Sequence, residues 1–459
     1  MHPRTDFDNI SPLDYRYIES DAAAYLSENA FTQYKLKAEL ALVRALHKRR
    51  VCSAAVVKEV ERACALVTTE EVYAEEGRIK HDIRALVNCI RDKVSDDAKP
   101  FVHMTATSQD IIDTANAARY KDAVLKVLVP ELLKLEKILI EIAKREAKTT
   151  QVGRTHGQHA VPITFGFSIS GYVSRLGQSI VAIEDLAKDL RGKFAGAVGA
   201  YNASSLFFTD PESFERDVLK EMGILPAEQS TQVAPAEPLV RLLCEITIAC
   251  GILANLSDDM RHLQRTEIGE VGEEFGKDQV GSSTMPQKRN PINFENVKSI
   301  WKIIVPRMQT AFMDQLSEHQ RDLTNSASSR THAETIGYAV SAVKRLTRTF
   351  NKLVVDKKNL AKNLDMQMGL VAAEPLYIIL AGLGHPDAHE KVRNLTLVAQ
   401  KKSTPLEKII LADAELKPYL KRMTAHQRAI IAKPSLYTGI AAAKASRVAS
   451  AWQKKLGIK

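Results

Sequence analysis

The chain is 459 residues long, more than one ordinary hydrophobic core needs, and this length favours about three domains. Its 45% hydrophobic and 26% charged residues are the proportions of a soluble globular protein, and its abundant Ala, Leu, Lys and Glu favour helix. The net charge of +9 does not favour a nucleic-acid partner, because Lys and Arg are scattered and no basic run is interleaved with aromatic residues. The excess of cations suits a small polyanionic substrate instead.

Cysteine usage and apolar runs indicate a cytoplasmic protein. The five cysteines are odd in number and form no C-x-x-C pair, so we expect reduced, mostly buried thiols and no disulfide framework or zinc knuckle. The first ten residues lack the apolar core of a signal peptide. The longest uncharged apolar run, residues 246–256, is too short to cross a bilayer, so no membrane association is expected.

Changes in helical pattern divide the chain into three predicted domains. Residues 1–110 combine short helical patterns with loops, including a turn at residues 11–17 and an amphipathic helix at residues 23–50. Residues 111–364 carry long helices, and residues 365–459 form a small C-terminal domain of shorter helices. We therefore expect an all-α, three-domain fold in which a long central helix bundle carries most loops of the site.

Apolar stripes run through the central segment at steps of three and four residues, which is the pattern of a helix bundle. The stripes consist of Leu128, Leu132, Leu135, Leu139 and Ile142, of Val297, Ile300, Ile304 and Met308, and of Ile336, Val340, Val343, Leu346, Phe350 and Leu353. They exceed what one compact bundle needs. Because such faces are often buried between subunits, we expect a homo-oligomer with a shared helical core.

Several histidines stand at candidate functional positions. His81 and Asp82 precede a restart of helical spacing, where they fit either a plain helix cap or a site. His156 and His159 lie in the polar segment 153–159, which is expected to be a loop. No H-E-x-x-H motif or cysteine partner stands near them, so a metal site is not favoured. An imidazole can instead donate a proton near neutral pH.

Other templates do not fit the chain. There is no G-x-S-x-G elbow, no complete P-loop and no dinucleotide-binding G-x-G-x-x-G motif. His385 and His389 are four residues apart, but the intervening Pro386 favours a turn with both histidines on a solvated surface. We therefore expect no cofactor and no metal.

The most informative stretch is V-G-S-S-T-M-P-Q-K-R-N-P-I-N-F-E-N at residues 280–296. Its small residues and flanking prolines can fold over a small anion. In the functional interpretation, Ser282 or Ser283 meets substrate, while Lys288 and Asn290 hold a carboxylate whose charge grows during reaction. In the alternative interpretation, the stretch is a surface loop before a helix.

The string G-S-S-x-M-P-x-K-x-N in this stretch resembles the signature of the fumarase/aspartase superfamily. Further blocks resemble the adenylosuccinate lyase family in the family's order and span residues 11–330, about two-thirds of the chain. The blocks are S-P-L-D-x-R-Y from Ser11, His81-Asp82, Thr107-Ser108-x-Asp110 with Asp113-Thr114-Ala115, G-R-T-H-G at 153–157, Thr231-Gln232, R-T-E-I-G-E at 265–270 and H-Q-R-D-L-T-x-S at 319–326 with Arg330.

This resemblance implies a β-elimination that releases fumarate from adenylosuccinate and from succinylaminoimidazolecarboxamide ribotide. It implies that Ser282 is the general base, His156 the general acid and His81 a helper near the departing nitrogen. Lys288 and Asn290 would stabilise the dianionic intermediate. It also implies a homotetramer whose active sites draw residues from neighbouring subunits.

The resemblance further implies a set of substrate-binding residues. Those matching the phosphate side are Arg16, Tyr17, Arg321, Ser326 and Arg330, those matching carboxylate binders include Thr107 and Ser108, and other polar contacts match Asp82, Gln232 and Asn296. Lys80, which precedes the His81-Asp82 block, and Ser283 and Arg289, which lie in the 280–296 stretch, complete the set.

The chain departs from the family at three places. Residues 235–238 read P-A-E-P where the family often has P-R-D-R, Lys80 stands where Arg is frequent, and Thr105-Ala106 replaces a Gly-Leu pair. These departures put substrate preference in question. The alternatives are 3-carboxymuconate cycloisomerase or argininosuccinate lyase, a non-catalytic structural protein on the same scaffold, and a helical nucleic-acid-binding protein.

Overall fold

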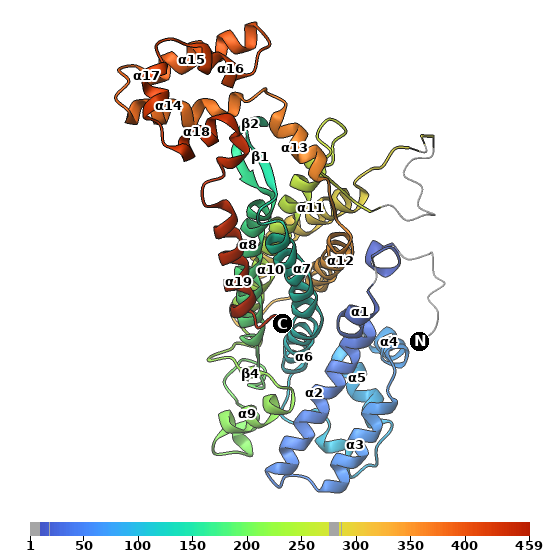
Figure 1. The fold of residues 1–459 in the computed structure, drawn as a ribbon. Helices are drawn as coiled ribbons and strands as arrows, with labels where there is room; N and C mark the ends of the chain where they lie inside the picture. The colour runs from blue at the N-terminus through green and yellow to red at the C-terminus, as the bar shows by residue number, and fades with distance from the viewer. Residues whose placement is uncertain (1–9, 18, 275–283, 286) are drawn as a thin grey trace. The chain divides into compact units, whose positions relative to one another are not determined.

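A computed structural model shows a chain built almost wholly of helices, which confirms the predicted all-α class (Figure 1). The structure describes residues 10–17, 19–274, 284, 285 and 287–459. Strands occur there only as short pairs: β1 (Thr150–Thr155) with β2 (Gln158–Thr164), β3 (Arg191–Gly192) with β4 (Leu225–Pro226), and β5 (Val271–Gly272) with β6 (Val354–Val355).

The chain forms two compact units. Unit 1 comprises Met1–Leu132, Ser179–Leu253 and Val297–Arg345, and unit 2 comprises Leu133–Gln178, Ala254–Asn296 and Leu346–Lys459. Their boundaries fall within α7 (Val129–Arg145), α8 (Phe165–Lys188), α10 (Glu237–Leu263), α11 (Ile292–Met313) and α12 (His332–Asn351). The three-domain division stays a prediction.

The predicted apolar stripes form the core of these long helices. Every residue of the three stripes is buried, with an exposed fraction of at most 9%. In unit 1, α7, α8, α10 and α12 pack around a narrow apolar gap whose lining includes Leu132, Ile183, Leu253 and Val343. The three- and four-residue periodicity therefore predicted the buried faces correctly.

The remaining helices of unit 1 are mostly shorter, except for α2, which has 21 residues. They are η1 (Pro12–Asp14), α1 (Ser20–Leu26), α2 (Glu28–Lys48), α3 (Ala54–Leu66), α4 (Thr69–Ile79), α5 (Asp82–Arg91), η2 (Lys99–Phe101), α6 (Ser108–Ala123), η3 (Val124–Leu128), η4 (Ser204–Leu206), α9 (Pro211–Glu221) and η5 (Ser328–Thr331). The single helix expected at residues 23–50 was wrong. The Ser27 hydroxyl accepts the Ala30 N–H at 3.2 Å, so Ser27 caps α2 and separates it from α1.

Unit 2 carries the β1–β2 hairpin and the C-terminal helices. These helices are α13 (Lys357–Asp365), η6 (Leu370–Ala372), α14 (Ala373–Gly382), α15 (Ala388–Lys401), α16 (Leu406–Ala412), α17 (Lys417–Arg422), α18 (Ala425–Ala432), η7 (Pro434–Leu436) and α19 (Ala441–Lys455). Leu376, Leu380, Val392 and Leu406 belong to one buried cluster of this region.

Two expectations about single side chains have different outcomes. Cys52, Cys64, Cys89 and Cys250 are buried free thiols and Cys244 is partly buried, as predicted. His385 was expected in solvent but is only 8% exposed, with its Nε2 atom 3.2 Å from the Glu415 carboxylate, whereas His389 is exposed.

Among the described residues, α10 is long and apolar enough to cross a membrane by length and composition alone, with a mean hydropathy of 1.8. However, 56% of the 18-residue stretch of α10 with this hydropathy is buried by the rest of the protein, as is usual for a core helix of a soluble protein.

Glu136 of α7 is an unpaired carboxyl group in the core. Its side chain is fully buried, and neither carboxyl oxygen has a hydrogen-bond partner. Burial raises the pKa of Glu136 from its ordinary value of 4.5 to about 9. As pH rises between these values, the carboxyl ionises in the unfolded chain but stays protonated in the folded one. The free energy of unfolding therefore falls by about 1.4 kcal/mol per pH unit.

We predict that Glu136→Leu, which has a similar volume and no titratable group, removes this pH-dependent loss. The midpoint of thermal unfolding should be higher for the variant already at about pH 5, because an unpaired buried polar group is removed, and its advantage should grow towards about pH 8. A difference between the two proteins that does not change with pH would contradict a buried, protonated Glu136.

Candidate active site

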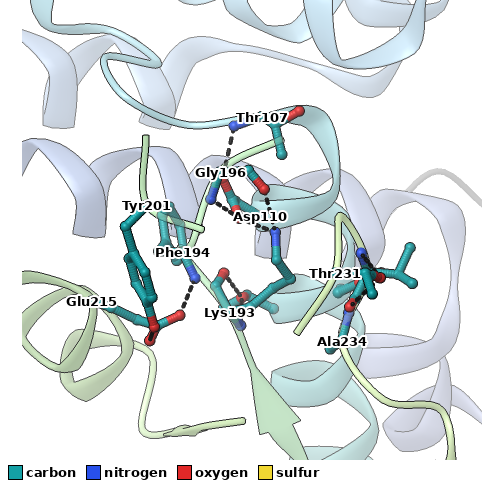
Figure 2. A network of polar contacts seen from close by, with 12 residues as sticks. Thr107, Asp110, Lys193, Phe194, Gly196, Tyr201, Glu215, Thr231 and Ala234 are labelled. Carbon is teal, nitrogen blue, oxygen red and sulfur yellow. Dashed lines mark hydrogen bonds and ion pairs between the residues drawn. The ribbon is translucent and has the colours of Figure 1, made fainter. Parts of the chain in front are cut away.

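Buried Asp110 organises the first turn of α6 (Figure 2). Its Oδ2 atom accepts the Thr107 N–H at 2.8 Å, and its Oδ1 atom accepts the Gly196 N–H at 3.3 Å and the Lys193 ammonium. Both charged side chains are 0% exposed. Burial raises the pKa of Asp110, while Lys193 and the two N–H donors oppose that rise. The turn that carries Thr107 and Ser108 is thereby tied to a segment that follows α8.

The segment around Lys193 is fixed by a second set of hydrogen bonds. The Lys193 N–H donates to the Thr114 hydroxyl at 3.1 Å, and that hydroxyl donates to the Lys193 carbonyl at 3.0 Å. Glu215 accepts the Phe194 N–H at 2.6 Å and the Tyr201 hydroxyl at 2.7 Å (Figure 2). The loop around Gly196 is therefore anchored on both sides.

Asp113, one turn further along α6, holds two more predicted binding segments. It accepts the Ala234 N–H at 2.8 Å, in the loop that contains Gln232, and burial raises the pKa of Asp113 to about 6. With its amide oxygen turned towards Arg321, Gln109 accepts from the guanidinium at 2.9 and 3.0 Å, and its nitrogen donates to Asp113 at 2.9 Å. The start of α6 thus brings together the segments of Thr107, Ser108, Gln232 and Arg321.

Two further predicted site residues, Asp82 and Arg330, act electrostatically on Lys35 of α2, whose side chain is only 5% exposed. Burial lowers the pKa of Lys35, the charges of Glu28 and Asp82 raise it, and the charge of Arg330 lowers it further. Asp82 and Arg330 therefore lie within electrostatic reach of the same ammonium group. They are 248 positions apart in numbering (330 minus 82) and meet only in the folded unit.

His81 is the N-cap residue of α5, so the cap interpretation was correct. Its Nδ1 atom accepts the Arg84 N–H at 3.2 Å. An acceptor Nδ1 places the proton of the neutral imidazole on Nε2, which leaves that N–H as a donor. Lys80, the C-cap of α4, has a left-handed backbone (φ 60°) and an exposed side chain.

Three phosphate-side residues lie in other loops of unit 1. Tyr17 packs against Tyr338 of α12, with ring centroids 6.0 Å apart, and the neighbouring Arg16 is exposed. Ser326 is also exposed, and its N–H donates to the Leu323 carbonyl at 3.1 Å. Their role towards phosphate stays a prediction.

His156 lies at the tip of a β-hairpin in unit 2, so the loop expected for residues 153–159 was wrong. His156 and Gly157, the two residues between β1 and β2, have φ values of 55° and 75°, the positive values that a type I′ turn requires. Gly153 sits at an irregularity of the pairing, where an added Cβ would lie 2.6 Å from the Val161 carbonyl oxygen. The hairpin presents the His156 side chain to solvent.

The base of this hairpin is held by Glu270, which is 0% exposed. Its carboxylate accepts two hydrogen bonds from the Arg154 guanidinium at 2.6 and 3.1 Å, one from Gln151 at 2.8 Å and one from Asn363 of α13 at 2.8 Å. Two parallel hydrogen bonds from a guanidinium to one carboxylate form a stronger and more directional ion pair than a single contact does.

Glu273, three residues further on, caps α11. Its carboxylate accepts the Asn293 N–H at 3.0 Å and the Phe294 N–H at 3.2 Å, and the Asn293 amide at 2.6 Å. A carboxylate at this position pairs the free N–H groups of a helix start and interacts favourably with the helix dipole. The end of the 280–296 stretch is thereby fixed to the β5 segment.

The predicted residues of that stretch lie just before and in the first turn of α11. Lys288 and Arg289 are exposed, and Asn290 and Asn296 are partly buried. The Lys288 N–H donates to the Met285 carbonyl at 3.0 Å. Ser282 and Ser283 lie outside the described residues.

Several side chains that position these segments had no predicted role of their own. They are Lys35, Gln109, Asp113, Lys193, Glu270 and Glu273. The available signal was the family resemblance, since Asp113 and Glu270 lie within blocks that match the family. Within the described part of the chain, no group of three or more His, Cys, Asp or Glu side chains could hold a metal ion.

Comparisons with known proteins match nearly the whole chain. The family described as "Lyase" matches residues 17–305, and the family described as "Adenylosuccinate lyase C-terminal" matches residues 317–428. The chain is 33% identical over 444 residues to adenylosuccinate lyase of Archaeoglobus fulgidus, covering 96% of this chain and 98% of the relative. It is 35% identical over 419 residues to adenylosuccinate lyase of Pyrococcus abyssi, covering 90% and 92%.

Solved structures show the same fold at lower identity. The 3-carboxy-cis,cis-muconate lactonizing enzyme from Pseudomonas putida has a TM-score of 0.86 at 24% identity, covering 96% of this chain and 99% of that one. A fumarate lyase from Mesorhizobium sp. BNC1 has a TM-score of 0.83 at 21% identity, covering 95% and 98%. With matches to the family along both halves of its sequence, the chain belongs to the adenylosuccinate lyase family of the fumarase/aspartase superfamily.

Proposed function

We propose that this chain catalyses the elimination of fumarate from adenylosuccinate, giving AMP, and from succinylaminoimidazolecarboxamide ribotide, giving the carboxamide. The observation that carries this proposal is the likeness to adenylosuccinate lyases at 33–35% identity over at least 90% of the chain. The structures of muconate-processing enzymes share the fold at lower identity and do not favour their reaction over this one.

The reaction needs a base and an acid on the two sides of the breaking bond. In the proposed mechanism the Ser282 oxygen takes a proton from the succinyl carbon next to a carboxylate, and the electron pair left there forms the carbon–carbon double bond of fumarate as the C–N bond breaks. His156 donates a proton to the departing nitrogen. Its exposed position at a hairpin tip supports this role, because a donor there can reach a substrate without being desolvated first.

Negative charge grows on the succinyl carboxylate when the proton leaves. The ammonium of Lys288 and the amide of Asn290 are suited to stabilise that charge, since fixed donors lower the barrier most where charge develops. We also propose that Lys288, six positions after Ser282 in the sequence, supports Ser282 as a base, because a cation close to a hydroxyl lowers the pKa of that hydroxyl. We assign the Nε2–H of His81 as a further donor to the departing group, since its Nδ1 atom already accepts the Arg84 N–H.

The rest of the substrate is anionic, and unit 1 offers matching donors. Thr107 and Ser108 stand at the start of α6, where their hydroxyl groups and the helix dipole favour a carboxylate. We assign the phosphate to Arg321 and Arg330 with Arg16, Tyr17 and Ser326, since guanidinium forks suit phosphate oxygens. Lys80, Asp82, Gln232, Ser283, Arg289 and Asn296 complete the proposed substrate contacts.

We also propose a cytoplasmic homotetramer whose active sites combine residues of several subunits and need no cofactor. Large apolar side chains on α11 support a subunit interface: Val305, Phe312 and Met313 are 37%, 50% and 61% exposed in the single chain. Closed symmetric assembly would bury such a face.

Substrate preference tests the proposed reaction. The purified protein is incubated separately with adenylosuccinate, succinylaminoimidazolecarboxamide ribotide, argininosuccinate and 3-carboxymuconate, and fumarate or lactone formation is followed by absorbance. We expect fumarate from the two succinyl nucleotides alone. Fumarate from argininosuccinate alone, or lactone from 3-carboxymuconate, would refute the purine assignment.

Removal of the proposed base should separate turnover from binding. Ser282→Ala is expected to lower kcat by about 10²- to 10⁴-fold, because it removes a proton transfer in the transition state, while substrate still binds with similar affinity. Stopped assays and calorimetric titration measure the two quantities. Ser446→Ala, which removes an exposed hydroxyl on α19, is the control. A Ser282→Ala enzyme with near-normal turnover would rule out Ser282 as the base.

Removal of the proposed acid should change the pH dependence as well as the rate. We expect His156→Ala to lower kcat by about 10²- to 10⁴-fold and to abolish the limb of the kcat profile at which the rate falls as the imidazolium loses its proton. The exposed His389→Ala on α15 serves as the control and should leave both quantities unchanged. A His156→Ala profile with the same shape as that of the unchanged enzyme would assign the proton to another group.

A further inference from the structure

Two buried carboxylates in one short segment of unit 2 hold both proposed catalytic segments of that unit. Glu270 pairs with Arg154 and Gln151 of β1, and Glu273 accepts the first N–H groups of α11. β1 leads directly to His156, and α11 follows directly on Lys288 and Asn290. We propose that Glu270 is a positioning residue that acts through the β1–β2 hairpin to fix the position of His156. This proposal rests on the proposed function of His156 as the acid.

The contacts of Glu270 point to positioning more than to bulk stability. All of its partners are polar donors directed at one carboxylate with 0% exposure, and the Arg154 fork fixes a plane as well as a distance. A buried ion pair contributes little net stability compared with apolar packing, but losing one partner leaves an uncompensated charge. The Glu270–Arg154 pair therefore contributes mainly a fixed geometry of the hairpin rather than net stability.

Arg154 lies two residues before His156, so the position of Arg154 in its pair with Glu270 also determines the position of the turn. It pairs across the hairpin with His159, and Thr155 pairs with Gln158, so the two-residue turn at His156 follows the last pair. A two-residue turn between paired strands leaves its residues little freedom. A shift of Arg154 therefore moves His156 with it.

Glu270 is itself held in place by contacts with α13 and with the residue just before α13. Asn363 of α13 donates to the carboxylate and also to the Ile268 carbonyl at 2.8 Å, and the Glu270 backbone accepts the Asp356 N–H at 2.9 Å. The carboxylate is thus supported from α13 on one side while it holds β1 on the other.

The test compares Glu270→Gln with Glu146→Gln, a matched control in the same unit. Glu146 is also a buried carboxylate, 3% exposed, but its side chain pairs with Arg145, Thr149 and Lys357, which all lie outside β1 and β2. We expect Glu270→Gln to lower kcat by about 10- to 100-fold with KM changed less than about 3-fold, because a small misplacement of a catalytic group costs this much. Glu146→Gln should lower the melting temperature and leave kcat unchanged.

A double variant separates positioning from a general structural defect. If Glu270 acts through His156, the variant His156→Ala/Glu270→Gln should turn over as slowly as His156→Ala alone, since the lost alignment concerns a group already absent. A further loss of 10-fold or more in the double variant would overturn the proposal. So would an unchanged kcat in Glu270→Gln, or an equal loss of kcat in Glu146→Gln.

A measurement that does not depend on turnover tests the anchoring of the hairpin separately from the proposed acid role of His156. Amide hydrogen exchange on the full-length enzyme should be faster for residues 151–158 in Glu270→Gln than in Glu146→Gln. Arg154→Lys, which keeps the charge but loses the fork, should reproduce the effect if Glu270→Gln does not fold. Normal turnover in His156→Ala would refute the acid assignment, whereas unchanged hairpin exchange in both Glu270→Gln and Arg154→Lys would refute the anchoring.

Discussion

The structure depends on one constraint: a carboxylate removed from water must be fully paired by donors of the same chain. Asp110 meets this constraint with Lys193, 83 residues away, and Glu270 meets it with Arg154, 116 residues away. Each pairing fixes a segment that bears a proposed catalytic or binding residue. The long helices supply rigid ends, and the buried carboxylates decide which loops are held at those ends and in which orientation.

Different groups of residues supply the stability of the fold and the geometry of the site. The apolar stripes of the long helices supply the hydrophobic driving force, because they remove large aliphatic side chains from water. The polar anchors add little net stability but restrict the loops to one conformation, which an elimination reaction needs if base, acid and carboxylate donors are to act on one substrate. Glu136 shows the opposite case, in which a buried carboxyl without a partner is held neutral.

The sequence predicted the helices better than the loops, for a physical reason. Periodicity reports which face of a helix is buried, so the stripes through Leu135, Ile304 and Val340 were correct. The break at Ser27 depends on one hydroxyl capping a helix, and the β1–β2 hairpin depends on two positive φ values at the turn. Neither changes the hydrophobic pattern enough to be seen. The resemblance named candidate site residues, but the buried partners Lys193 and Glu270 gained a role only from contacts between distant segments.

We expect the loops held by these anchors to supply one reaction centre for the elimination of fumarate. The decisive experiment is a crystal structure of the assembled Ser282→Ala enzyme with bound adenylosuccinate. It should place the His156 imidazole about 3 Å from the departing nitrogen, with Lys288 and Asn290 at a succinyl carboxylate and Arg321 at the phosphate, whichever subunits contribute them. A substrate bound in a pocket that His156 does not reach from any subunit would contradict it.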